Sequence, residues 1–250
     1  MGRAENSLVG EQALGCFLRY DSLDQLVVLM DNLTLKSFTE KAMKLYGMQH
    51  SRSFRVAWVL EEAGLAYDYE KIDLMKGQGN SPEFLAVNPG GKVPALDDDG
   101  FVLTESSAIC SYVARKVPEK QLIPDANNQL CALYDQWCMF AMAELEQPLW
   151  AISRHTFVYE ESRRAPAIIP SAKEEWSIAL ALVSQALEGK QYIVNEAFSV
   201  ADILIVQSFM WAEAIQLDLE HDNLRAYKAN LMKRPAFIQA MAVEAEKGAC

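Results

Sequence analysis

The hydrophobic pattern of this 250-residue chain alternates between strand-like and helical spacing after Met43, and this alternation limits the fold. A short apolar run from Met43 to Tyr46 ends at Gly47. An apolar stripe with helical spacing then runs from Phe54 to Gly64, a residue suited to a helix C-cap. The stretch from Tyr67 to Asp73 alternates as strands do. This strand–helix–strand unit predicts two parallel strands joined by a right-handed crossover.

Further signals complete a small α/β unit. A proline follows Ser81, where a short helix is expected to begin. The runs Val93 to Leu96 and Phe101 to Leu103 flank an Asp-Asp-Gly turn and predict a β-hairpin. The run Thr104 to Lys116 predicts a helix, so the predicted domain covers residues 43–117.

After a predicted linker at residues 118–125 the pattern is nearly all helical. The sequence therefore predicts an all-α domain at residues 126–250 behind the α/β domain. We interpret residues 1–42 as an N-terminal extension outside the functional fold, with a short helix over Ser22–Leu35; a docking helix is the alternative. Helices of the second domain are expected over Ala126–Arg154, Ser171–Glu188, Ser199–Gln216, Asn223–Met232 and Pro235–Val243.

Composition excludes several classes of function. A formal net charge of −11 argues against a nucleic-acid partner, because neutralising phosphates requires clustered Lys and Arg. The five cysteines form no C-x-x-C pair and the three histidines are far apart, which predicts neither a disulfide framework nor a metal site. The apolar run Leu26 to Met30 is too short to span a bilayer, and no secretory signal is visible. We therefore expect a cytoplasmic protein with no metal and no membrane partner.

Two motifs of the α/β unit suit a peptide ligand. Val93-Pro94 places a proline at the head of a strand, and a cis bond there turns the Val93 backbone outward, where an extended peptide can pair with it. Glu105-Ser106 opens a helix, where free N–H groups and a hydroxyl suit an α-carboxylate and the Glu105 carboxylate suits an ammonium. The alternatives are an ordinary loop-to-strand proline and a plain N-cap.

Two other serine-containing stretches precede helices. In His50–Arg55 a hydroxyl could donate to a thiolate. Lowering a thiol pKa by about two units requires nearly 3 kcal/mol. One hydrogen bond to a charged group supplies about 1.5–3 kcal/mol, so the helix N-terminus must assist. Capping is the alternative there. Ser199, followed three residues later by Asp202, is interpreted as a structural capping box.

Taken together, these residues resemble the soluble glutathione transferase family. The resemblance implies a thioredoxin-like first domain, a helical second domain and a homodimer. The His50–Arg55 stretch is most similar to a bacterial and fungal branch with a serine in the catalytic loop. The matching features are Met43–Gly47, Ser51–Leu65, Asn88–Pro94, Glu105-Ser106 with Ala108, Ile109 and Tyr112, and Ser199–Asp202.

The resemblance also implies roles for individual residues. Val93, beside cis-Pro94, would pair with the cysteinyl backbone of glutathione, and Glu105 would hold the γ-glutamyl end with Ser106. Ser51 is the expected catalytic residue, although the loop allows His50, Arg52 or Ser53 to contact the thiol instead. The predicted glutathione-binding residues are Ser51, Arg52, Ser53, Lys92, Val93, Pro94, Glu105 and Ser106.

A second substrate, a small apolar electrophile, is expected between the loop after the first strand and the long helix. Candidate contacts are Trp137, Phe140 and Trp211, with Met142 and Trp150 nearby; simple core packing is the alternative. The predicted activity is conjugation of the glutathione thiolate to this electrophile. A disulfide or peroxide oxidoreductase and a non-catalytic interaction module are the other readings, and the lack of a cysteine in the loop disfavours a mixed-disulfide mechanism.

Overall fold

The computed structural model describes residues 42–124 and 128–248. The predicted extension over residues 1–42, with its helix at Ser22–Leu35, lies outside the described residues except for Ala42. Everything below concerns the described part of the chain.

A mixed four-stranded sheet forms the centre of the first domain, with strand order β2-β1-β3-β4. β1 (Met43–Gly47) pairs in parallel with β2 (Tyr67–Lys71), and the connection between them is α3 (Ser53–Ala63). β3 (Ala95–Asp98) is antiparallel to both β1 and β4 (Phe101–Thr104). The predicted parallel crossover and hairpin are confirmed.

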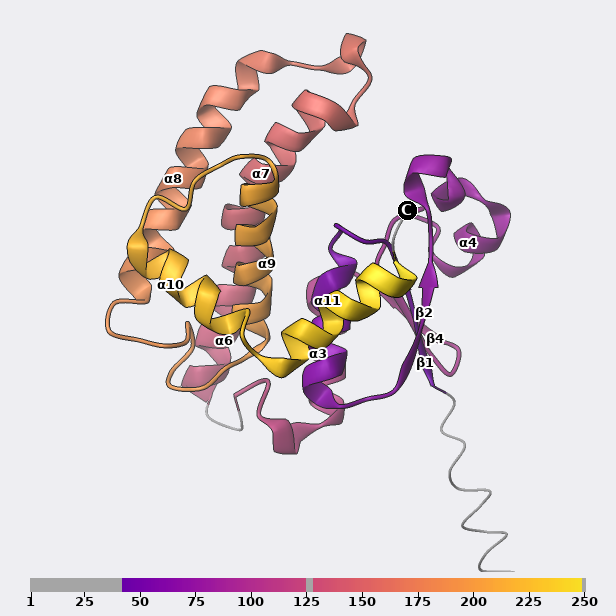
Figure 1. The fold of residues 1–250 in the computed structure, drawn as a ribbon, viewed down its shortest axis with the longest axis horizontal. Coiled ribbons are helices and arrows are strands. Elements are labelled where there is room, and N and C mark those ends of the chain that lie inside the picture. Colours follow the sequence, from indigo (N-terminus) through magenta and orange to yellow (C-terminus); the bar gives the residue numbers. More distant parts are fainter. Residues whose placement is uncertain (1–41, 125–127, 249–250) are drawn as a thin grey trace, which may run out of the picture. The chain divides into compact units, whose positions relative to one another are not determined.

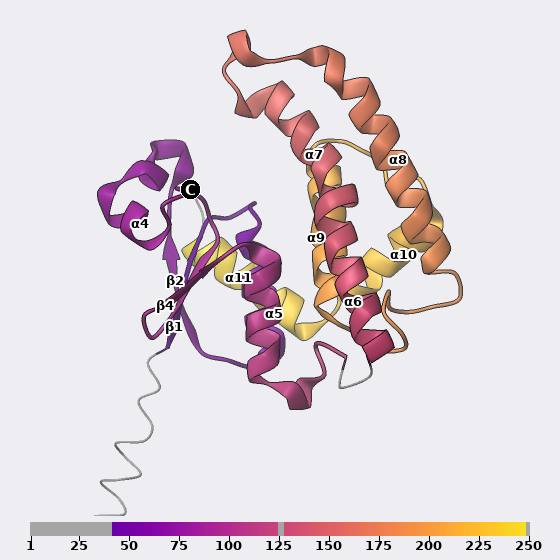
Figure 2. The ribbon, with the colours of Figure 1, turned by 180° about the vertical axis from the view of Figure 1, so that it is seen from behind.

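Helices cover both faces of the sheet (Figures 1 and 2). α3 and α5 (Ser106–Lys116) pack against each other on the face turned toward the helical domain, and α4 (Pro82–Val87) lies on the opposite side. Trp58 of α3 is fully buried and stacks edge-on against Phe237 at 4.9 Å. Phe237 belongs to α11 (Pro235–Lys247), so the last helix returns from the helical domain to pack on the first.

The second domain contains only helices within the described residues. One regular helix was predicted over Ala126–Arg154. From residue 128 on, the structure has an α-helix, a π-helical turn at Ala141–Leu145, a second α-helix and a π-helical turn at Arg154–Val158. The helices are α6 (Asn128–Phe140), α7 (Glu146–Ser153), α8 (Ile169–Ala186), α9 (Val200–Ala214) and α10 (Asp222–Leu231), and single 3-10 turns occur at Leu74–Lys76, Gln78–Asn80, Pro118–Lys120, Glu161–Arg163 and Pro166–Ile168.

Two predicted strand boundaries were wrong by two residues. β2 ends at Lys71, because the side chain of Asp73 instead accepts a hydrogen bond from the Lys76 N–H, at 3.1 Å, and starts a 3-10 turn. β3 begins at Ala95, after the Val93–Pro94 bond. The predicted fold class, a thioredoxin-like α/β domain followed by an all-helical domain, is confirmed. No helix in the described ranges is long and apolar enough to cross a membrane.

Candidate functional site

The register of the sheet brings the three predicted glutathione motifs to the same end of three neighbouring strands, which we call the sheet edge. Tyr46 near the end of β1 pairs with Ala95 at the start of β3, and Ala95 pairs with Thr104 at the end of β4. The loop after β1 follows Tyr46 and Gly47, the Val93–Pro94 bond comes directly before Ala95, and Glu105 comes directly after Thr104. Because neighbouring strands lie about 4.8 Å apart, the three motifs span roughly 10 Å, the length of an extended tripeptide.

The Val93–Pro94 bond is cis, as the sequence motif led us to expect. The Val93 peptide group lies outside the ladder, since β3 starts at Ala95. Asn88 braces the preceding loop: its amide donates to the Lys92 carbonyl oxygen at 2.6 Å, and its side-chain oxygen accepts from the Gly90 N–H at 2.9 Å. The loop therefore holds the Val93 backbone at the edge of the sheet in a fixed orientation.

Glu105 and Ser106 begin α5 in contrasting environments. Glu105 is exposed and adopts φ 67°, a left-handed conformation that is unusual for a residue with a side chain. Such backbone outliers concentrate at ligand-binding positions. Ser106 is buried, and its hydroxyl oxygen accepts a hydrogen bond from Arg55 Nη1 at 3.1 Å. The exposed carboxylate and the first N–H groups of α5 thus lie together at the end of β4.

The loop after β1 presents Ser51 rather than Ser53. Ser51 is partly exposed, and its hydroxyl has two acceptors within reach, the Met48 carbonyl oxygen at 2.6 Å and Ser53 Oγ at 2.8 Å. Ser53 is fully buried and accepts from the Met48 N–H at 3.3 Å. A Cβ on Gly47 would lie 2.9 Å from the Ser53 Cβ, so only glycine allows this close turn. Contact with the thiol stays a prediction, and burial favours Ser51 over Ser53 for it.

Arg52 contacts side chains of α7 and α9. Its Nε donates to Glu146 Oε1 at 2.6 Å, and its guanidinium lies over the rings of Trp150 and Trp211, 5.2 and 4.8 Å from their centroids. Arg52 was predicted to bind glutathione, and the structure places its charge beside the predicted acceptor residue Trp211. The contact of Arg52 with glutathione stays a prediction.

Arg55 and Glu146 form a buried ion pair that sequence reasoning missed. Arg55 Nη2 lies 2.5 Å from Glu146 Oε2, and the Arg55 side chain is 0% exposed. The guanidinium also donates to the hydroxyls of Ser106 and Ser208, at 3.1 and 3.2 Å. The available signal was a lone arginine in the apolar face of the α3 segment, because a buried charge requires a partner.

The predicted acceptor residues divide into two groups. Trp211 lies beside Trp150, with ring centroids 6.1 Å apart, and its indole N–H donates to Ser153 Oγ at 3.1 Å. Trp137 and Phe140 instead pair edge-to-face with each other at 5.2 Å and pack against the main hydrophobic core. Only Trp211 among the three is therefore brought next to the loop after β1, through Arg52.

The C-terminal helix α11 and the residue after it, Gly248, contact the loop after β1. The Gln49 N–H donates to the Gly248 carbonyl oxygen at 3.0 Å, and Glu244 accepts from the His50 backbone and from the Tyr69 hydroxyl, the latter at 3.1 Å. Burial raises the pKa of Glu244 to about 8, against the lowering effect of these two hydrogen bonds. No sequence motif pointed to Glu244, whose partner Tyr69 lies 175 residues away along the chain.

Asp202 has the structural role that the sequence predicted. It accepts from the Ser199 N–H at 2.8 Å, from the Ile193 N–H at 2.9 Å and from the Tyr227 hydroxyl at 2.6 Å. The capping box at the start of α9 is confirmed.

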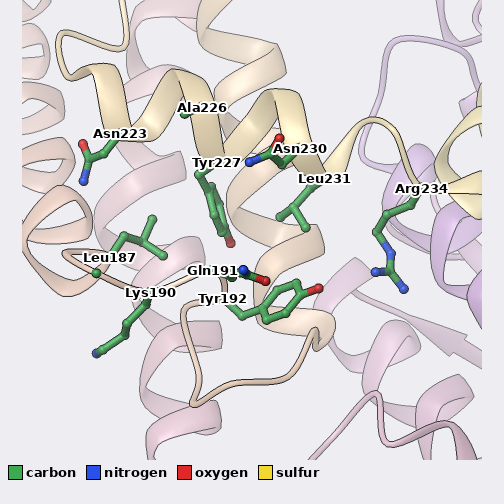
Figure 3. Close-up of a pocket in the computed structure, with 11 residues that line it drawn as sticks. Leu187, Lys190, Gln191, Tyr192, Asn223, Ala226, Tyr227, Asn230, Leu231 and Arg234 are labelled. Atoms are coloured by element: carbon green, nitrogen blue, oxygen red, sulfur yellow. The ribbon is translucent and has the colours of Figure 1, made fainter.

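A pocket of about 580 Å³ lies in the helical domain between α10 and the loop after α8 (Figure 3). Tyr192, Asn230 and Leu231 are among its lining residues. It contains none of the predicted site residues and is not part of the sheet edge described above.

The β2-β1-β3-β4 sheet with a cis-proline at the head of β3, joined to a helical domain, defines the class of thioredoxin-fold proteins with a helical second domain. Two family models match the chain: the glutathione S-transferase N-terminal domain over residues 41–115 and the C-terminal domain over residues 152–235. The chain belongs to the glutathione S-transferase family.

Individual relatives agree with this assignment. Glutathione S-transferase GstA of Escherichia coli O157:H7 is 30% identical over 208 residues, which cover 82% of this chain and all of the relative. A probable glutathione S-transferase of Oryza sativa subsp. japonica is 32% identical, over 78% of this chain and 93% of its own. The crystal structure of a glutathione transferase from Methylococcus capsulatus str. Bath superposes with a TM-score of 0.74 at 32% identity, covering 82% of this chain and 100% of that one.

Proposed function

We propose that this protein is an enzyme that binds glutathione along the sheet edge and transfers its sulfur to an electrophilic carbon. The observation that carries the proposal is the strand register, which aligns the loop after β1, the cis-proline bond and the start of α5. Relatives named glutathione S-transferase, about 30% identical over most of the chain, support it independently.

Each part of the peptide has a matching group on this edge. The Val93 N–H and carbonyl pair with the cysteinyl residue as an added strand would, beside cis-Pro94. Glu105 takes the ammonium of the γ-glutamyl end, and the first N–H groups of α5 with the Ser106 hydroxyl take its carboxylate. Lys92 is exposed next to Val93 and offers a cation to the glycyl carboxylate.

Ser51 stabilises the thiolate in this proposal, as in the serine-containing branch of the family. Its hydroxyl turns from the Met48 carbonyl or from Ser53 Oγ and donates to sulfur, while the nearby N-terminus of α3 adds a favourable dipole. The thiol proton leaves to water, the thiolate attacks the electrophilic carbon, and the leaving group departs with the bonding electrons. Alignment of the two reactants then supplies much of the rate.

A homodimer in the cytoplasm completes the proposal. The predicted interface elements are the helix at residues 104–116 and the long helix. Met139 of α6 is 70% exposed, and Phe101 of β4, which packs on Tyr112 of α5, is 52% exposed. Burying such side chains in a second copy would remove apolar surface from water. The described cysteines Cys110, Cys131 and Cys138 are free thiols, as expected in a reducing compartment.

Retention on immobilised glutathione, followed by thiolate absorbance against pH, tests the proposal. The wild type should be retained and should lower the thiol pKa of bound glutathione. Ser51→Ala should remain bound and return that pKa toward its free value. Ser177→Ala, on the exposed surface of α8, is the matched control and should behave as wild type.

The outcomes separate the alternatives. Failure of the wild type to be retained would favour a non-catalytic interaction module. Retention with disulfide reduction in place of conjugation would favour the oxidoreductase reading. An unchanged thiolate titration in Ser51→Ala would contradict the assignment of Ser51 while leaving glutathione binding in place.

A further inference from the structure

Arginine and aromatic side chains alternate in a continuous series that begins beside Ser51. The Arg52 guanidinium lies over Trp211 and Trp150, 4.8 and 5.2 Å from their centroids. Arg154 follows, 5.6 Å from the Trp150 centroid and 6.0 Å from that of Tyr159. Arg163 lies over the ring of Tyr159, 4.6 Å from its centroid. We call these six residues the arginine–aromatic wall.

The wall follows one face of α7 and the turn after it. Glu146, Trp150 and Arg154 are spaced four residues apart, which places them on the same side of a helix. α9 packs against this helix and contributes Trp211. The wall therefore extends outward from the loop that carries Ser51, along the surface where the acceptor must approach the glutathione sulfur.

Three of the six wall residues are arginines, although the chain carries a formal net charge of −11. Arg52 and Arg55 share a single carboxylate, that of Glu146. In the described part of the chain, neither Arg154 nor Arg163 has a carboxylate within salt-bridge distance. The Nε of Arg154 is inaccessible to water and has no hydrogen-bond partner there. The rest of the Arg154 side chain is partly exposed and contacts the rings of Trp150 and Tyr159, so its guanidinium can donate to the oxygen of an incoming anion.

We propose that the arginine–aromatic wall binds the second substrate, and that it selects planar aromatic electrophiles bearing an anionic group such as a carboxylate. The aromatic ring of the acceptor stacks on the indole and guanidinium faces, and its anion accepts hydrogen bonds from Arg154, a planar fork suited to carboxylates. The proposal rests on the proposed transferase function and replaces a simply apolar acceptor with an amphipathic one.

A matched pair of acceptors tests the selection: 4-chloro-3-nitrobenzoate, an anion at pH 7, and the neutral 4-chloro-3-nitrobenzamide. In both, the thiolate displaces chloride and leaves a thioether, so only the charge on the ring differs. Each kcat/KM is divided by the rate constant of the uncatalysed reaction with glutathione, to remove the intrinsic reactivity. The wild type should favour the benzoate at least about fivefold.

Variants locate the preference. Arg154→Gln should bring the normalised ratio close to one, because both acceptors lose the same stacking face and only the benzoate also loses its ion pair. Arg154→Lys should retain part of the preference, because it keeps the charge and loses the fork. Arg225→Gln removes the same charge from α10, where Arg225 pairs with Asp218, and should leave the ratio unchanged.

A binding measurement separates this proposal from the proposed transferase function. Quenching of tryptophan fluorescence by each acceptor, in the presence of S-methylglutathione, reports affinity without turnover. Stronger binding of the benzoate with no conjugation would support the wall and contradict the transferase. Conjugation of both acceptors at equal normalised rates, a ratio unaffected by Arg154→Gln, or binding of neither acceptor would overturn the wall as a selective site.

Discussion

Glu146→Gln removes one charge from the buried network while keeping the size of the side chain. Glu146 accepts from Arg52 at 2.6 Å and lies 2.5 Å from Arg55, whose side chain has no exposure to water that could compensate the loss. Removing one partner of a buried ion pair costs about 3–5 kcal/mol, because the remaining charge stays buried without a counter-ion. We therefore expect the free energy of unfolding to fall by about this amount.

Urea unfolding followed by tryptophan fluorescence measures the loss. With a denaturant slope of about 3 kcal/mol/M, the midpoint should fall by roughly 1–2 M. Glu213→Gln is the control, since Glu213 pairs with Lys228 at the surface and is 49% exposed. An exposed pair contributes at most about 1 kcal/mol. Equal losses in the two variants would refute the reasoning.

The double variant Arg55→Met with Glu146→Leu completes the test. Either single change leaves the other member of the pair buried without its counter-charge, whereas the double variant removes both charges. All three variants lose hydrogen bonds to neighbouring groups, so the difference between them reports the ion pair. The double variant should be more stable than the sum of the single losses predicts, by more than about 1 kcal/mol. Additive losses would mean that the two side chains do not interact.

Three further predictions concern other parts of the molecule. Burial raises the pKa of Glu244 to about 8, well above the ordinary carboxyl range, so the folded protein keeps a proton that the unfolded chain releases; the free energy of unfolding should fall by up to about 5 kcal/mol as pH rises from about 4.5 to 8. Glu244→Gln should remove this decline in urea titrations between pH 5 and 9, and an unchanged slope would contradict the shift. Asp202→Ala leaves the buried Tyr227 hydroxyl and two backbone N–H groups without an acceptor and should cost about 3 kcal/mol or more in thermal or urea unfolding, while a cost below about 1 kcal/mol would show that water replaces the carboxylate. Phe101→Glu should convert the proposed dimer to a monomer in sedimentation at micromolar concentration, and an unchanged mass would place the interface elsewhere.

The fold, the cis-proline bond and the start of α5 could be predicted because all three depend on local patterns. The period of the apolar residues identified the strands and helices, and Val93-Pro94 and Glu105-Ser106 are each defined by adjacent residues. The capping box at Ser199–Asp202 was predicted for the same reason, since its partners are three residues apart. Where a boundary was wrong, as at Asp73, a side chain took a backbone hydrogen bond that the strand pattern assigned to the ladder.

The chemistry around the loop after β1 could not be predicted because its partners are distant in sequence. Arg52 contacts Glu146 across 94 residues, and Tyr69 contacts Glu244 across 175. Periodicity describes which face of a helix is apolar; it does not say which charge of one helix meets which charge of another. The sequence left Arg52 as one alternative to Ser51 for the thiol contact, and it gave no sign that Arg52 pairs with Glu146.

The buried network joins the two halves of the proposed site through one carboxylate. Arg55 contacts both Ser106, on the γ-glutamyl side, and Glu146, which in turn holds Arg52 beside Trp211 on the acceptor side. Apolar residues in place of this pair would cost little stability, because a buried ion pair rarely exceeds its own desolvation penalty. Stability therefore does not explain the pair. The pair instead positions two groups of the proposed site. Its hydrogen bonds fix the Ser106 hydroxyl and the Arg52 guanidinium relative to each other. The apolar double variant would keep the fold and lose that alignment.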